Sequence, residues 1–223
     1  MFEEKDYFMN MIKQFAEAIG KIMGLKAENK IEESQAVLSE TFKYFTDLNK
    51  EVIEALPYEI LIHKVSGSGQ MNSEKRLMLA ELLAQQADIY EAKGEKPRAR
   101  NLYLKSLNIL LDALLNDDNV ASEENMNKVN ELIDKIGWIN ISNQSKILLF
   151  QYYELAKSYA KAEDVLFNLI ETNEANKDIL LKGIAFYERL SEIDHAELEK
   201  ANLPIDEVLE GLTNLKGYRN GVS

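Results

Sequence analysis

Residues 83–111 read LAQQADIYEAKGEKPRARNLYLKSLNILL, and this stretch decides the fold. Apolar and small side chains recur at steps of three and four on both sides of Gly94, the spacing of one face of an α-helix. Gly94 stands where a helix commonly ends in a left-handed residue. Pro97 falls in the first turn of the next segment, where proline is tolerated. The stretch therefore predicts two helices joined by a tight turn.

The same periodicity extends in both directions along the chain. Ser73, Ser122 and Ser142 are expected N-caps, because a serine hydroxyl can accept a hydrogen bond from a free backbone N–H. Gly137 is expected to end a helix as Gly94 does. No segment alternates at period two for long enough to indicate a strand, so the fold class is all-α. Helices are expected at 4–26, 31–45, 49–56, 58–65, 73–93, 96–116, 122–137, 142–157, 159–173, 178–190, 196–201 and 205–215.

The central hairpin resembles a tetratricopeptide repeat. The resemblance rests on Ala87 and Tyr90 in the first helix, Gly94 in the turn, and Ala99 and Tyr103 in the second helix. Small residues at such positions let paired helices touch, and the aromatic rings fill the space between neighbours. The resemblance implies an irregular stack of antiparallel helical hairpins, a tetratricopeptide-like α-solenoid, with one clear repeat at residues 80–113.

A second copy of the pattern follows, because Tyr153 and Ala162 repeat the nine-residue step from Tyr90 to Ala99. A weaker third copy centres on Phe186, 33 residues after Tyr153, which is close to the usual repeat length. Two parts are therefore expected, residues 1–118 and residues 119–223. The second part would end in a capping helix and continue directly from the first.

The first 115 or so residues also resemble an uncharacterised family of Gram-positive bacterial proteins. Residues 6–15, DYFMNMIKQF, and residues 87–94, ADIYEAKG, carry this resemblance. It implies a helical fold and a cytoplasmic setting, and no function.

Tetratricopeptide repeats usually bind peptides on the concave face formed by the first helix of each pair. The matching positions here carry acids and alanine instead of the Lys and Asn that clamp a terminal carboxylate in chaperone-binding members. We therefore expect a groove that is acidic at one end and apolar at the other, and that accepts a basic or amphipathic segment of a protein partner. The candidate groove residues are Ala84, Asp88, Glu91, Ile147, Gln151, Glu154, Leu180, Ile184 and Tyr187.

Two apolar features have alternative interpretations. Leu180, Ile184 and Tyr187 would equally suit an ordinary core covered by the terminal helix at 205–215. The helix at 4–26 has apolar residues at Phe8, Met11, Ile12, Phe15, Ile19 and Ile22 and could pack a homodimer, although intramolecular core is the favoured interpretation.

The composition excludes several functional classes. A net charge of −12 opposes binding to nucleic acid or anionic lipid, since both need Lys and Arg to neutralise phosphates. The chain has no cysteine, which excludes disulfides, thiol catalysis and cysteine-ligated metals. Residues 1–6 are acidic where a signal peptide would be basic, and no apolar run approaches the ~20 residues of a membrane span. We expect a cytoplasmic protein.

No motif indicates catalysis, a metal or a cofactor. Glu192 and His195 have the Glu-x-x-His spacing of di-iron bundles, but the motif occurs once and such sites need two. The pairs Glu51/Glu54 and Glu171/Glu174 leave open a magnesium-dependent helical hydrolase. A purely structural homo-oligomer is a further alternative. The preferred interpretation is a non-enzymatic protein-interaction module.

Overall fold

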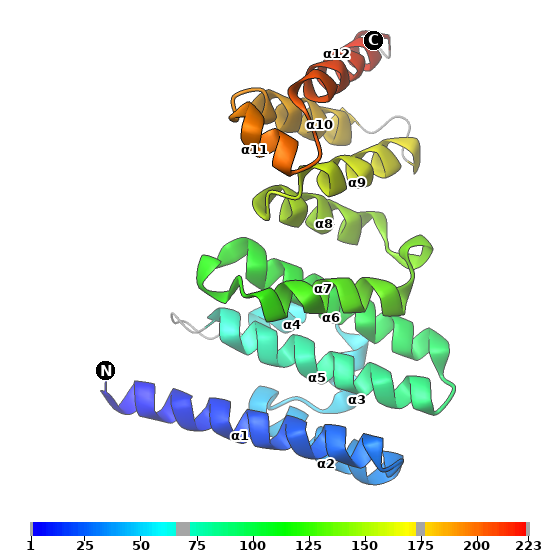
Figure 1. The fold of residues 1–223 in the computed structure, drawn as a ribbon. Coiled ribbons are helices and arrows are strands. Elements are labelled where there is room, and N and C mark those ends of the chain that lie inside the picture. Colours follow the sequence, from blue (N-terminus) through cyan, green and yellow to red (C-terminus); the bar gives the residue numbers. More distant parts are fainter. Residues whose placement is uncertain (1, 66–71, 173–176, 222–223) are drawn as a thin grey trace. The chain divides into compact units, whose positions relative to one another are not determined.

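The computed structural model describes residues 2–65, 72–172 and 177–221, and the side chains of residues 9–65, 73–172 and 177–217. Every regular element in these residues is helical, which confirms the all-α class (Figure 1). Close contacts divide the chain into two compact units, residues 1–141 and residues 142–223.

Unit 1 contains the helices that precede Ser142. They are α1 (Phe2–Ala27), α2 (Ile31–Thr46), α3 (Lys50–Ala55), α4 (Tyr58–Val65), α5 (Asn72–Ala92), α6 (Lys96–Asn116), η1 (Asp118–Val120), α7 (Glu123–Ile136) and η2 (Trp138–Asn140).

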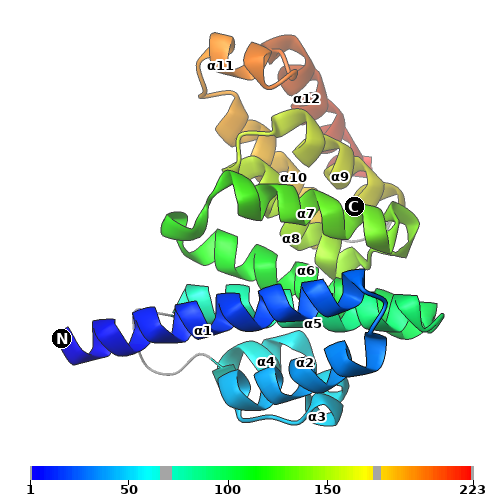
Figure 2. The ribbon, with the colours of Figure 1, turned by 60° about the horizontal axis from the view of Figure 1, so that its bottom comes forward.

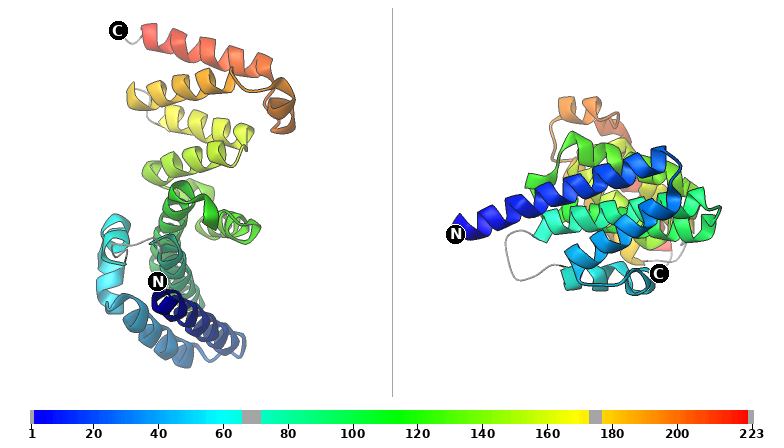
Figure 3. Two further views of the ribbon diagram at one scale, coloured as in Figure 1. Left: turned by 90° about the vertical axis from the view of Figure 1, so that its left-hand side faces the viewer. Right: turned by 90° about the horizontal axis from the view of Figure 1, so that it is seen from below.

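Unit 2 contains α8 (Asn143–Leu155), α9 (Tyr159–Thr172), α10 (Lys177–Leu190), α11 (His195–Lys200) and α12 (Ile205–Gly221). The left view of Figure 3 shows α8, α9, α10 and α12 following one another as layers within this unit.

The division between the units differs from the boundary expected after residue 118. Helix α7 packs against α6, so it belongs to unit 1 and the division falls between Ile141 and Ser142. The sequence showed a break in helical periodicity at residues 117–119, but a local break does not prevent the next helix from folding back on the previous one.

Local signals place most helix ends correctly. Gly94 has φ +78° and its N–H donates to Glu91 O at 2.9 Å, as expected for a left-handed helix end. Ser122 and Ser142 are N-caps whose hydroxyls accept from Asn125 N and Ser145 N. Ser73 is not an N-cap, because α5 begins at Asn72 and Ser73 lies inside the helix.

Helix α5 is the centre of unit 1. It packs against α1, α2, α4 and α6, and its side chains from Met78 to Tyr90 are buried except at Glu81 and Asp88. Small residues permit the closest approach to α6: Ala87 and Ala99 are buried, and Ser106 Oγ donates to Ala80 O at 2.6 Å. Helices α3 and α4 lie on the opposite side of α5 from α7 (Figures 1 and 3).

In unit 2, α10 and α12 pack closely against each other through two glycine contacts. Gly183 of α10 lies against Leu215, and a Cβ added there would come within 2.6 Å of the leucine Cδ1. Gly211 of α12 lies against the ring of Tyr187, where an added Cβ would come within 2.6 Å of the phenol oxygen. Each glycine therefore provides the space for the other helix's large side chain, and α12 covers α10.

We predict that Gly211→Ala destabilises the protein by about 2 kcal/mol. The new methyl group would overlap the buried ring of Tyr187, and overpacking typically costs about 1–3 kcal/mol, more than the ~1 kcal/mol of helix propensity gained. Gly217→Ala is the control in the same helix, because nothing lies within 4 Å of its added Cβ. Urea unfolding should show a loss for Gly211→Ala only, and equal effects would contradict the close packing.

Candidate functional site

The candidate groove residues of unit 1 lie on α5. Ala84 is buried, so its side chain is part of the helix-packing core. Asp88 lies where four helices meet: its carboxylate accepts from Lys26 of α1 at 2.6 Å, from Tyr103 of α6 at 2.6 Å, and from Lys135 of α7.

Burial and hydrogen bonding act on Asp88 in opposite directions. Burial alone would raise the pKa of the Asp88 carboxyl, because it disfavours the charged form. Hydrogen bonds from Lys135, Lys26 and Tyr103 favour that form and are the stronger effect, so the pKa is lowered. Burial, followed by the bond to Asp88, raises the pKa of Tyr103, which stays a neutral donor.

The neighbouring acids of α5 are paired as well. Glu81 forms an ion pair with Lys128 of α7 and accepts from Gln85 at 2.7 Å. Glu91 accepts from the Tyr103 hydroxyl at 2.8 Å and lies 3.9 Å from Lys135 Nζ. The three acids of this face therefore meet three lysines of the same unit, so the expected attraction for a basic partner is largely neutralised.

The apolar candidates of unit 2 are buried. Leu180, Ile184 and Tyr187 all lie in the core, and the fully buried ring of Tyr187 lies against Gly211 of α12. The Tyr187 hydroxyl donates to Glu163 Oε1 at 2.6 Å. Burial raises the pKa of Glu163, and the tyrosine bond opposes that rise. Of the two interpretations of these three residues, the structure places them as core, not as an open groove surface.

The candidates on α8 are only partly available. Ile147 is half-buried and Gln151 is exposed. Glu154 accepts two hydrogen bonds from the Arg189 guanidinium, at 2.7 and 2.9 Å, which fixes α8 to α10. Of the nine predicted groove residues, Gln151 and Glu91 keep exposed side chains.

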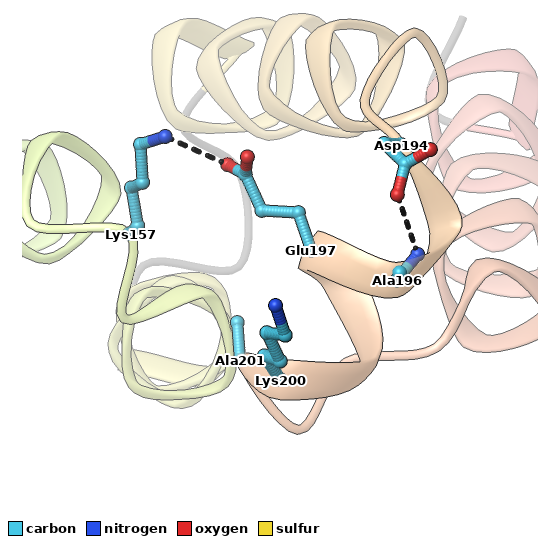
Figure 4. Close-up of a pocket in the computed structure, with 6 residues that line it drawn as sticks. All are labelled: Lys157, Asp194, Ala196, Glu197, Lys200 and Ala201. Carbon is cyan, nitrogen blue, oxygen red and sulfur yellow. Dashed lines mark hydrogen bonds and ion pairs between the residues drawn. The ribbon is translucent and has the colours of Figure 1, made fainter.

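Unit 2 carries a shallow depression of about 440 Å³ that the sequence did not indicate (Figure 4). Its charged groups serve the fold: Lys157 lies 3.1 Å from Glu197, and the Asp194 carboxylate caps α11 by accepting from Ala196 N at 2.9 Å. The Tyr159 hydroxyl also donates to Glu197, and burial followed by this bond raises the pKa of Tyr159 to about 12. These contacts indicate that the depression belongs to the packing of α11 against the beginning of α9. Its lining is Lys157, Asp194, Ala196, Glu197, Lys200 and Ala201.

The carboxylate pairs considered for magnesium do not form a metal-binding group in the described residues. Glu54 accepts hydrogen bonds from Arg98, at 2.8 Å, and from Tyr90. Glu174 lies outside the described residues. Nowhere in the described ranges do three or more His, Cys, Asp or Glu side chains gather as metal ligands would.

The outer face of α1, the helix for which the sequence left a homodimer contact open, carries exposed apolar residues. Met9, Ile12 and Met23 have relative exposures of 57%, 36% and 53%, and Ala16 and Gly20 between them are also exposed. These five residues follow one another at steps of three and four, so they form one stripe along the helix, the α1 stripe. The space beside Gly20 is empty to 4 Å.

The opposite side of α1 provides its internal packing. Ile22 is fully buried, and Phe15 meets Phe45 of α2 edge to face with centroids 5.3 Å apart. Ile12, which we assigned to the same face as Phe15, belongs to the exposed stripe instead. In Figure 2 and the right view of Figure 3, the N-terminal turns of α1 extend past α2 and α5. Among the helices of the described residues, none is long and apolar enough to cross a bilayer.

We predict that Asp88→Asn lowers the free energy of unfolding by about 2 kcal/mol at neutral pH, since hydrogen bonds to a charged group contribute about 1.5–3 kcal/mol. The lowered pKa means that this stabilisation is present above the unfolded pKa, near 4, and is lost as pH falls toward the folded pKa. Urea unfolding between pH 7 and pH 3 should therefore show a smaller loss on acidification in the variant.

The matched control is Asp47→Asn. Asp47 pairs with Lys43 at 2.7 Å on an open surface, with 92% of its side chain exposed, and its left-handed conformation tolerates asparagine. It should leave unfolding unchanged. If the free energy of unfolding falls with pH in Asp88→Asn as much as in the wild type, Asp88 is not the group responsible for the pH dependence.

Comparison with known proteins supplies a family and no function. Neither the search of curated proteins nor the search of solved structures found a match. The family resemblance expected from the sequence covered the first 115 or so residues, whereas a family model matches residues 1–220. The chain therefore belongs to DUF6483, a family of unknown function.

Proposed function

We propose that this chain is a non-enzymatic protein-interaction module with tetratricopeptide-like hairpins, and that the α1 stripe binds an amphipathic helix of a protein partner. The observation that carries the proposal is the exposure of Met9, Ile12 and Met23 in one line on a helix whose other side packs Ile22 and Phe15 against its own unit.

The cost of leaving this stripe in water supports a binding role. Burying a Met or Ile side chain contributes about 1.5–3 kcal/mol. Covering three partly exposed side chains would therefore contribute a few kcal/mol to the free energy of binding. Single exposed apolar residues are common on soluble proteins and need no explanation. Several aligned along one helix form a contiguous strip, which is the usual mark of a contact with another protein.

The shape of the stripe favours a helix as the bound element. Ala16 and Gly20 separate the larger Ile12 and Met23, so a partner backbone could approach closely at the middle while the large side chains pack at both ends. The steps of three and four match the apolar spacing of an amphipathic helix.

The hairpin α5/α6 supports the tetratricopeptide-like description. Ala87, Tyr90, Ala99 and Tyr103 are all buried, and Gly94 has the left-handed conformation that the turn requires. The acids of α5 are paired and the apolar candidates of α10 are buried, so neither set is available to a partner. We therefore propose α1, and not the groove, as the binding surface. We still expect an amphipathic partner segment, but we no longer expect a basic one.

In vivo photo-crosslinking tests this proposal. We predict that a benzophenone amino acid at Met23 gives discrete adducts with another polypeptide, and that adding Ile12→Lys abolishes them, because a lysine ammonium cannot be buried unpaired in an apolar contact.

The control is Ile60→Lys on α4, which alters an isoleucine of similar exposure, 43%, on another surface of unit 1. Adducts should persist in that background. Absence of polypeptide adducts from position 23, or adducts that survive Ile12→Lys unchanged, would contradict the proposal.

A further inference from the structure

The α1 stripe has a spacing that reads the same in both directions. From Met9 the steps to Ile12, Ala16, Gly20 and Met23 are three, four, four and three, so the pattern is symmetric about Ala16. A surface that is symmetric about a point can pair with a copy of itself turned by 180°, which is the geometry of a two-fold dimer.

We propose that the partner is a second copy of this chain, with the two α1 helices antiparallel and crossing at Ala16. This inference rests on the proposed function and names the occupant of the same surface. The pairing sets Met9 against Met23 of the second copy, Ile12 against its Gly20, and Ala16 against its Ala16.

Each of these pairs is complementary in size. Ile12, a large branched side chain, faces the open space beside Gly20, where nothing lies within 4 Å. Methionine faces methionine at both ends, and its flexible thioether adapts to irregular gaps. The two alanines at the centre let the helix axes approach closely.

The charges beside the stripe favour the antiparallel arrangement. Lys13 and Glu17 lie on one flank of the stripe, 3.9 Å apart and about 75% and 68% exposed. A two-fold axis through Ala16 brings this flank of both copies to the same side. Lys13 of each copy then lies about two residues, or ~3 Å along the axis, from Glu17 of the other. A bridge across the pair can form twice.

A parallel pairing lacks this complementarity. It would place the Lys13 flank of one copy against the other flank of α1, where Lys26 reaches back to Asp88 of α5. That flank is occupied by the fold of its own unit.

The contact is short, so we expect a reversible dimer. Residues 9–23 span about 21 Å of helix, and one helix pair of that length buries less than the ~1,600 Å² of a standard interface. Interfaces below the standard size are typical of weak, transient association.

Sedimentation equilibrium over about 1–500 µM tests the proposal. We predict that the apparent mass rises from 25.5 kDa toward twice that value with concentration. Ile12→Lys should weaken association at least tenfold, while Ile60→Lys should not change it, with both variants retaining the helical circular dichroism of the wild type.

The absence of cysteine in the chain permits a direct test of orientation. With the antiparallel pairing, Ala16→Cys alone should form an intermolecular disulfide under mild oxidation. Met9→Cys alone should not, since its two copies would lie about 21 Å apart, but a mixture of Met9→Cys with Met23→Cys should.

The outcomes separate the two proposals. A protein that stays monomeric, but whose residue 23 crosslinks to a different polypeptide, overturns self-pairing and leaves the interaction module standing. A monomer without such adducts contradicts both. A dimer that Ile12→Lys does not weaken, or one in which Met9→Cys crosslinks as readily as Ala16→Cys, overturns the antiparallel α1 pair.

Discussion

Asp88 lies on a helix that is buried along most of its length, and unit 1 depends on how that carboxylate is neutralised. A charge in such a place costs several kcal/mol unless partners replace the lost water. Lys26, Tyr103 and Lys135 supply those partners from α1, α6 and α7, and the lowered pKa shows that their bonds outweigh the effect of burial. One carboxylate on α5 is therefore hydrogen-bonded to side chains of three other helices.

This arrangement determines which surfaces remain for function. Lys26, Lys128 and Lys135 pair with the acidic side chains of α5 and cover that face of the helix. The same carboxylates therefore cannot both stabilise unit 1 and attract a basic partner. In unit 2, Gly183 packs against Leu215 and Gly211 against Tyr187, so α12 covers this face of α10. This face of α10 is therefore also unavailable to a partner. Helix α1 differs, because its inner side packs against α2 and α5 while Met9 and Met23 on its outer stripe stay more than half exposed among the described residues.

The features predicted well from sequence are those set by neighbouring residues. Gly94, Ser122 and Ser142 act on the backbone within a few residues, and the ends of α5, α7 and the start of α8 follow them closely. Asp88 and Tyr187 lie on helices, as expected. Their environments depend on α7 and α12, which are distant in sequence. The residues next to Asp88 and Tyr187 in the sequence do not indicate that Lys135 of α7 pairs with Asp88, or that α12 packs on Tyr187.

Helix α1 shows a different limit. Its apolar residues occupy an arc too wide for one packing partner, and spacing alone assigned Ile12 to the side of Phe15. Only the placement of α2 and α5 separates the inner residues from the stripe. Gly20 and Gly24 lack a side chain that would hinder the approach of another helix, and no atom of the described residues lies within 4 Å of a Cβ added at either position.

The most direct test of this account is a solvent paramagnetic relaxation measurement on methionine methyl groups, made on dilute and concentrated protein. We predict that the methyl groups of Met9 and Met23 are strongly relaxed in dilute protein and become protected in concentrated protein, while the buried Met78 is protected throughout. If Met9 and Met23 are protected in the dilute monomer, the stripe is covered by its own chain. If they stay fully accessible at every concentration, the stripe is not the surface through which copies of this chain associate.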